Sequence, residues 1–208
     1  YQRYLAALLE GRRVVCASIV EGLIKDGITM RSLYADLFHV SMYEIGTLWE
    51  QNRISVATEH LCTAITESLL GIVYPQVFSA TRVGRSAVIS CVANEYHQLG
   101  GKMVADIMEM HGWDTTFFGA NTPLPGLLEA VQARRPDVVG LSFSVYYNLG
   151  ALLDTVETLS NCVPGLPIWV CGQGFSVASH AFVQSLENVR YIPSLEVLEK
   201  ELEAMSSP

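Results

Sequence analysis

Charge is scarce in this chain, and basic clusters and long apolar runs are absent. Lys and Arg number 13 against 21 Asp and Glu, so the formal net charge is −8. This acidic balance argues against direct nucleic-acid binding by these residues. No apolar run approaches the roughly 20 residues of a membrane span, and no basic segment followed by an apolar stretch opens the chain. We therefore expect neither a membrane segment nor a signal peptide within it.

The sequence also lacks the cysteine patterns that are typical of disulfide bonds or of zinc sites. The chain has five cysteines, an odd number, and no CxxC, so neither a disulfide framework nor a zinc site is indicated. We expect all of them to be small apolar core residues of a cytoplasmic protein: Cys16, Cys62, Cys91, Cys162 and Cys171. Half of the 208 residues are hydrophobic and only 16% are charged, which excludes a disordered chain.

The first part of the chain, residues 1–80, has helical periodicity without strand signals. A short helix that Gly11 interrupts should be followed by one with its apolar face at Val14, Val15, Ile19 and Leu23. Thr29 and Ser55 are the expected N-caps of two longer helices, which Asn52 separates. Short connections make neighbouring helices antiparallel, so we predict a four-helix bundle.

The second part, residues 86–208, follows a polar link at 80–85 and alternates strand and helix patterns. We expect strands at 87–92, 114–118, 138–143, 168–171 and 190–192. Helices are expected at 98–112, 123–134, 149–162, 176–187 and 194–205. This alternation predicts an α/β fold with a doubly wound, flavodoxin-like sheet of five parallel strands.

The loop after the first strand, residues 94–101, reads NEYHQLGG and should lie where such sheets bind ligands. Glu95, two residues before His97, can hold the imidazole Nδ1 and leave Nε2 for a metal. Gly100 and Gly101 would let a helix begin close to a bulky ligand. The other reading is a loop histidine that makes only local hydrogen bonds.

Other ligand classes of this fold require motifs that are missing. A dinucleotide site needs G-x-G-x-x-G in this loop, and a flavodoxin-like site needs a hydroxyl-rich phosphate loop. A phospho-acceptor receiver domain would end its third strand in Asp and its fifth in Lys. Here Ser142, Phe143 and Ser144 end the third strand, and Tyr191 and Ile192 the fifth.

The His97 loop resembles the Asp-x-His-x-x-Gly signature of cobalamin-binding domains, with Glu95 in the Asp position. Residues 140–145, GLSFSV, and 170–175, VCGQGF, are similar to the family's two later signatures. The resemblance implies cobalamin bound base-off, with His97 as lower axial cobalt ligand oriented by Glu95. It also implies that Ser142 bonds the buried base. The further cofactor-binding residues would be Gly100, Ser144, Gly172 and Gly174.

The helical part contains a second pattern: Trp49, then nine residues, then Glu59 and His60. An aromatic plane, a carboxylate and an imidazole at one end of a bundle suit an adenosyl group. On periodicity alone, Trp49 could equally belong to the core, and Glu59 could serve the helix N-terminus. The pattern is similar to that of CarH-type cobalamin-dependent photoreceptors, as is NTPLP at 121–125. That resemblance implies a cap over the upper face of the corrin, with Val56 also at the cofactor.

The implied function is light sensing, not enzymatic catalysis. Light would cleave the cobalt–carbon bond of adenosylcobalamin, and a conformational or oligomeric change would regulate transcription; methylcobalamin and hydroxocobalamin are the other candidate forms. Glu50 stands where the best-known relatives have a second His, so we expect water or His60 on cobalt after photolysis. No helix-turn-helix pattern is present, so a DNA-binding domain upstream of Tyr1 or a separate partner protein is expected, along with a possible homo-oligomer.

Two alternatives share the cobalamin domain. A corrinoid carrier of a methyltransferase system has the same two-part layout, but it needs an open upper face for its methyl donor and acceptor. An adenosylcobalamin concentration sensor would use every residue named above and would differ only in ignoring light.

Overall fold

The computed structural model describes residues 1–74, 80–176 and 186–206. The chain divides into two compact units, Tyr1–Phe78 and Ser79–Pro208. Among the helices in these ranges, none combines the length and the hydropathy needed to cross a membrane.

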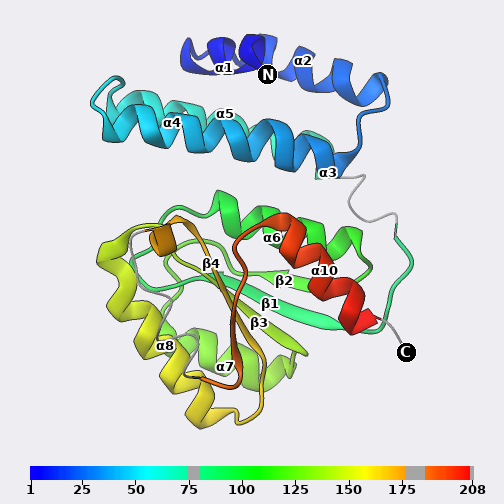
Figure 1. Cartoon of the computed structure of the whole chain (residues 1–208), viewed down its shortest axis with the longest axis vertical. Coiled ribbons are helices and arrows are strands. Elements are labelled where there is room, and N and C mark those ends of the chain that lie inside the picture. Colours follow the sequence, from blue (N-terminus) through cyan, green and yellow to red (C-terminus); the bar gives the residue numbers. More distant parts are fainter. Residues whose placement is uncertain (75–79, 177–185, 207–208) are drawn as a thin grey trace. The chain divides into compact units, whose positions relative to one another are not determined.

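The first unit contains the four expected helices (Figure 1). They are α1 (Gln2–Leu9), α2 (Arg13–Lys25), a continuous helix formed by α3 (Met30–Ser32), a π-helical segment (Leu33–His39) and α4 (Val40–Glu50), and α5 (Val56–Val73). Thr29 and Ser55 are N-caps as predicted, each accepting a 3.1 Å hydrogen bond from the backbone N three residues later. Asn52 ends α4 in the left-handed region, with φ 55°. The π-helical segment was not predicted.

The predicted apolar face of α2 is wrong. Val14 is 78% exposed, and Cys16 and Val20 are the buried residues of this helix. The sequence around them is apolar on every side of the helix, so periodicity does not select the face that meets the core. The core of this unit instead includes Tyr4, Leu8, Tyr34, Phe38, Ile45, Ile65 and Leu69.

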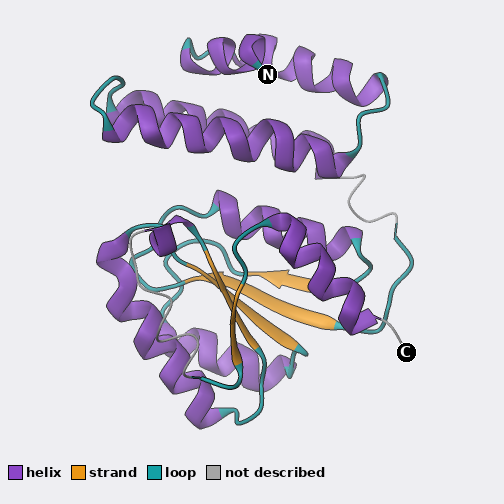
Figure 2. Ribbon diagram, in the orientation of Figure 1, coloured by secondary structure: helices purple, strands orange, loops and turns teal. Residues whose placement is uncertain are grey.

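The second unit is a parallel sheet in the order β2-β1-β3-β4-β5, covered by helices on both faces (Figure 2). The strands are β1 (Ser86–Cys91), β2 (Asp114–Phe117), β3 (Val138–Ser142), β4 (Ile168–Cys171) and β5 (Val189–Tyr191). Helices α6 (Leu99–Met110) and α10 (Leu195–Ser206) cover one face, and α7 (Leu124–Arg134) and α8 (Leu149–Cys162) cover the other. The predicted doubly wound fold is confirmed. Most of the predicted helix at 176–187 lies outside the described residues.

The carboxyl ends of the three central strands are in register. Cys91 pairs with Ser142, and Ser142 pairs with Cys171, on neighbouring parallel strands. The loops that follow β1, β3 and β4 therefore leave the sheet side by side. The candidate site lies at the carboxyl ends of these strands. Both strands β1 and β3 are buried almost throughout, as strands covered on two faces must be.

The prediction for the cysteines holds in part. All five are free thiols, and Cys16, Cys62 and Cys91 are buried. Cys171 is partly buried, whereas Cys162 is exposed at the end of α8 and is therefore not a core residue.

Candidate functional site

The loop after β1 pairs an exposed imidazole with a buried carboxylate. Glu95 is 0% exposed, and its Oε1 lies 2.6 Å from Nδ1 of His97, whose side chain is 51% exposed. The same oxygen accepts a 2.9 Å hydrogen bond from the backbone N of His97. The Glu95 carboxylate therefore reaches Nδ1 although Glu is one methylene longer than Asp. Because Nδ1 is engaged by Glu95, Nε2 is the ring nitrogen that would coordinate a metal.

The second oxygen of Glu95 is held by the segment that follows β3. Backbone N atoms of Ser144 and Val145 donate to Oε2 at 2.8 and 3.0 Å, and Nδ2 of Asn148 donates at 3.1 Å. Burial alone would raise the pKa of Glu95, but the hydrogen bonds from His97 and from the backbone of Val145 and Ser144 lower it to about 2. Glu95 is thus ionised at neutral pH, and it orients the His97 ring.

Asn148 was not singled out in the sequence. It is 6% exposed and lies 53 residues from Glu95 in the chain. Its position, where the turn after β3 enters α8, is the only signal that sequence reasoning could have used.

A second loop, after β2, is joined to the His97 loop. Oδ1 of Asn121 accepts a 2.8 Å hydrogen bond from the backbone N of Asn94, and the backbone N of Asn121 donates to the carbonyl of Glu95 at 2.8 Å. Oε1 of Gln98 accepts from the backbone N of Ala120 at 3.2 Å. The loop after β2 is therefore part of the frame that holds His97.

Ser142 lies between two thiols at the carboxyl ends of the strands. Burial raises the pKa of Cys91 to about 12 and that of Cys171 to about 11, while hydrogen bonding with Ser142 acts in the opposite direction on each. Both thiols therefore stay protonated at neutral pH, and they are poor metal ligands in that form. The buried Ser142 hydroxyl is the group expected to contact a buried base.

The turn after β4 depends on two glycines that pack against Phe143. Gly172 has φ +117°, and a Cβ there would stand 2.0 Å from the carbonyl oxygen of Phe143. A Cβ at Gly174 would stand 2.3 Å from the Phe143 ring. The packing against Phe143 is therefore sufficient to require glycine at both positions. Their predicted role in making room for a ligand stays a prediction.

Gly100 and Gly101 differ in their surroundings. A Cβ on Gly101 would meet Phe117 at 3.2 Å and Ser142 at 3.5 Å, so this glycine serves the packing of α6 on the sheet. Its predicted role in letting the helix begin close to a ligand stays a prediction. A Cβ on Gly100 would meet nothing within 4 Å, so this position can face a bulky ligand.

The arrangement fits a metal that brings most of its own ligands. In residues 1–74, 80–176 and 186–206, no group of three or more His, Cys, Asp or Glu could hold a metal ion. A metal held at this loop would be bound through Nε2 of His97, because Glu95 engages Nδ1. The residues that would hold such a cofactor are His97, oriented by Glu95, together with Gly100, Ser142 and Ser144.

The candidate residues of the helical unit lie on either side of the turn between α4 and α5. Trp49 is at the end of α4 and is 42% exposed, which does not fit a core role. Oε2 of Glu59 lies 2.5 Å from Nδ1 of His60, and Oε1 accepts a 2.9 Å hydrogen bond from Thr63. Glu59 therefore holds His60, whose side chain is 74% exposed.

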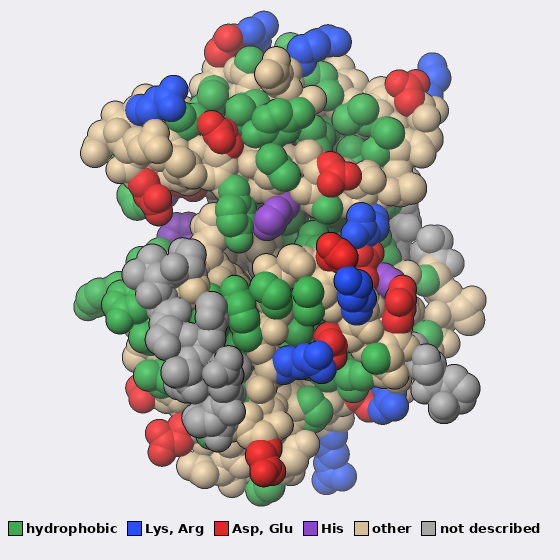
Figure 3. All heavy atoms as spheres, in the orientation of Figure 1, with side chains coloured by type: hydrophobic (Ala, Val, Ile, Leu, Met, Phe, Trp, Pro, Cys, Tyr) green, Lys and Arg blue, Asp and Glu red, His purple; other side chains and the backbone are tan. Residues whose placement is uncertain are grey.

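Several other hydrophobic side chains of the helical unit are also exposed (Figure 3). They include Val40, Tyr43, Val56, Leu61 and Ile72. Val56, predicted at the cofactor, is 52% exposed in the first turn of α5.

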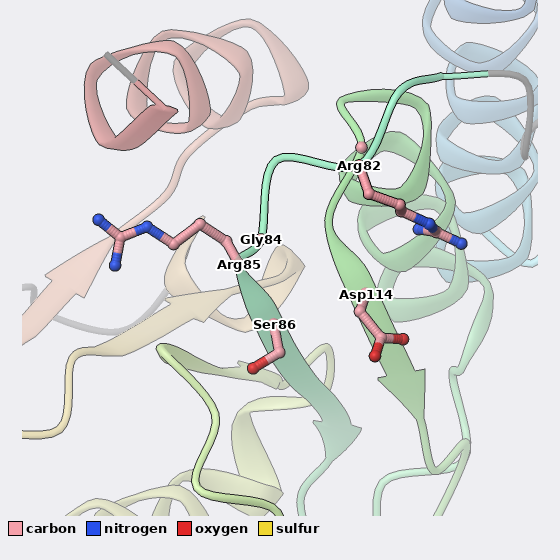
Figure 4. Close-up of a pocket in the computed structure, with 6 residues that line it drawn as sticks. Arg82, Gly84, Arg85, Ser86 and Asp114 are labelled. Carbon is pink, nitrogen blue, oxygen red and sulfur yellow. The ribbon is translucent and has the colours of Figure 1, made fainter. Parts of the chain in front are cut away.

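A pocket lies near the N-terminal ends of β1 and β2 (Figure 4). His97 follows the other, carboxyl end of β1. Arg82, Arg85 and Asp114 line the pocket. Arg82 pairs with Glu109 at 2.5 Å, and Arg85 pairs with Asp137 at 2.8 Å. These ion pairs balance the charge of the pocket, and none of the predicted site residues is part of it.

Both units match models of known protein families. Residues 85–192 match the model described as B12 binding domain, and residues 1–74 match a second model with the same description. The prediction of a cobalamin-binding protein is confirmed by these matches.

Two curated relatives come from Myxococcus xanthus. The chain is 33% identical over 132 residues to the HTH-type transcriptional repressor CarH and 39% identical over 126 residues to the HTH-type transcriptional repressor CarA. The matches cover 62% and 59% of this chain, but only 43% and 42% of the relatives. The chain thus spans less than half the length of either repressor.

Solved structures share the fold at low sequence identity. The monomethylamine corrinoid protein of Methanosarcina barkeri superimposes with a TM-score of 0.83 at 11% identity, covering 97% of this chain and 96% of that chain. The methanol:cobalamin methyltransferase complex MtaBC from the same organism gives 0.54 at 16% identity, covering 98% and 78%. At these identities the likeness establishes the two-unit architecture alone.

Proposed function

The chain belongs to the B12-binding domain family, and on that premise we propose that it is a light-responsive switch that holds adenosylcobalamin. The observation that carries the proposal is the exposed His97 ring, held from behind by the buried carboxylate of Glu95 at 2.6 Å. With Nδ1 donating to Glu95, Nε2 would be the nitrogen that holds the cobalt of the cofactor, and the hydrogen bond to Glu95 makes Nε2 more basic.

Three parts of the sheet unit have separate tasks in this proposal. Glu95 keeps His97 in one tautomer, and the segment after β3 keeps Glu95 ionised. Ser142 provides a buried hydroxyl for the nitrogen of the displaced base, because a hydroxyl can donate to a heterocyclic nitrogen. The two neighbouring thiols remain neutral and do not compete with His97 for the metal.

The residues of the helical unit are the reason that we propose adenosylcobalamin and not another form of the cofactor. Adenosylcobalamin supplies a cobalt–carbon bond that visible light cleaves. We assign Trp49, Val56 and Glu59 to the adenosyl group, because they are incompletely buried at one end of the unit. His60, held by Glu59, is the candidate to bind cobalt once the adenosyl group has left. Loss of contacts made only in the dark state would change which arrangement of the protein is stable.

The output that we propose is transcriptional, and the chain acts as a binding and switching module, not as an enzyme. The similarity to two transcriptional repressors supports this choice over a methyl carrier. DNA recognition would fall to a region or partner other than these acidic residues.

The test is an absorption spectrum with adenosylcobalamin, in the dark and after green light, beside the His97→Ala variant. We expect a stable dark spectrum that converts fully on illumination, and altered cobalt ligation in His97→Ala. Exposed Tyr147, on the segment after β3, offers a matched control as Tyr147→Ala. Binding of methylcobalamin but not adenosylcobalamin, with methyl transfer to an added acceptor, would replace the proposal with the methyl-carrier function.

Two further measurements address the switch. Equal dark and lit elution volumes on size exclusion would remove a change of oligomeric state from the proposal. A lit spectrum of His60→Ala identical to that of the wild type would remove His60 as a cobalt ligand.

A further inference from the structure

One side chain of the loop after β2 holds the backbone that carries Glu95. Oδ1 of Asn121 accepts the hydrogen bond of the Asn94 backbone N, and the Asn121 backbone N donates to the Glu95 carbonyl, both at 2.8 Å. The two bonds grip the short segment Asn94–Glu95 at both ends. They come from a loop that contributes none of the predicted cofactor-binding residues.

Asn94 lies in a backbone conformation that is uncommon for non-glycine residues, so hydrogen bonds to this segment help to maintain it. Asn94 has φ 65° and Asn121 has φ 48°, both in the left-handed region, which Asn tolerates better than most non-glycine residues. The carbonyl of Asn94 also accepts a 3.2 Å hydrogen bond from Nδ2 of Asn148. The segment is thus held from the loops after β2 and β3 before any ligand arrives.

We infer that Asn121 is a positioning residue for cobalt ligation, acting through Asn94 and Glu95 on His97. Asn121 touches neither the His97 ring nor the Glu95 carboxylate in the described contacts. It fixes the backbone from which that carboxylate reaches Nδ1. This inference rests on the proposed role of His97, and it adds a third loop to the site. Without the Oδ1 acceptor, Glu95 and His97 would sample several positions, and Nε2 would ligate in only part of the population.

The variants separate the lost acceptor from the relief of strain. Asn121→Gly keeps the left-handed backbone but removes the acceptor, whereas Asn121→Asp keeps an acceptor oxygen. Arg135→Gly is the matched control, because Arg135 also has φ 48°, at the C-terminus of α7, and no described hydrogen bond ties its side chain to this loop.

The first readout uses the cofactor-free full chain. Hydrogen exchange of the Asn94 amide should become about ten-fold faster in Asn121→Gly, the factor that one ordinary hydrogen bond contributes. It should stay unchanged in Asn121→Asp and Arg135→Gly.

The second readout is the electron paramagnetic resonance spectrum of each chain with cob(II)alamin. Each chain is labelled with ¹⁵N-histidine, so that splitting of the cobalt signal by His97 differs from splitting by the ¹⁴N of the cofactor's own base. We expect Asn121→Gly to lose part of the ¹⁵N splitting, and Asn121→Asp to restore the wild-type pattern. Full ¹⁵N splitting in Asn121→Gly would overturn the inference alone. A wild-type spectrum identical to that of His97→Ala would overturn the proposed function, and this inference with it.

Discussion

Replacing Glu95 by Gln should destabilise the sheet unit by an amount that depends on pH. The pKa of Glu95 is about 2 in the folded protein, against an ordinary value of 4.5. This difference corresponds to about 3 kcal/mol of folding free energy at neutral pH. Gln cannot reproduce it, because one carboxylate oxygen becomes an NH2 group that faces buried donors.

The sign of the pH dependence follows from the lowered pKa. Folding is favoured by ionised Glu95 above pH 4.5, and this contribution is lost as the pH falls from there toward 2. At pH 3 about half of the 3 kcal/mol should remain. The stability gap between wild type and Glu95→Gln should therefore narrow on acidification.

Urea unfolding of the cofactor-free chain at pH 7 and pH 3 measures this gap, and carbon NMR of the Glu95 carboxyl measures its pKa directly. Glu157→Gln, at an exposed position of α8, is the control, and its effect should stay within about 0.5 kcal/mol at both values. His97→Ala in both backgrounds isolates the contribution of the ring in a double-mutant cycle. Equal stability of Glu95→Gln and wild type at pH 7, or a gap that widens in acid, would refute the reasoning.

Three further substitutions test other parts of the site. Gly172→Ala should lower the free energy of unfolding by 2 kcal/mol or more, roughly, because the new Cβ meets the Phe143 carbonyl at a positive φ; an unchanged urea midpoint would contradict this. Gly100→Ala should keep or slightly raise stability, since its Cβ meets open space, but weaken cobalamin binding in an absorbance titration. Trp49→Ala should change the free energy of unfolding by no more than about 1 kcal/mol, because Trp49 is 42% exposed. It should reduce the preference for adenosylcobalamin over methylcobalamin, measured as a ratio of dissociation constants. An unchanged ratio would exclude Trp49 from the adenosyl site.

Much of the fold was predictable because its signals are local. Strands such as β1 and β3 are short apolar runs between turn residues, so their predicted ends fall within one residue of those observed. The caps at Thr29 and Ser55 were predictable for the same reason. The π-helical segment Leu33–His39 was not, because a change from i+4 to i+5 bonding leaves the apolar pattern nearly intact.

The candidate site shows the same difference between local signals and long-range contacts. The pairing of Glu95 with His97 follows from two residues of spacing within one loop. The contacts of Glu95 with Asn148 and of Asn94 with Asn121 join residues 53 and 27 positions apart. They depend on strand order and register, which local patterns do not specify. Sequence reasoning therefore found the pairing of Glu95 with His97, but missed the residues that support it.

The strand order also has a consequence for how the chain folds. β1 pairs with β3, and this first pairing joins Ala87 to Val138, so a long stretch must be synthesised before the central ladder can close. The helices of the first unit, by contrast, follow one another through short turns and are complete at Val73. During synthesis the helical unit can fold while the sheet is still unfinished, and the sheet sets the slow step of refolding. Nascent chains halted before Val138 could pair β1 with β2 alone, so the other side of β1 would stay unpaired, and unpaired apolar strands promote aggregation.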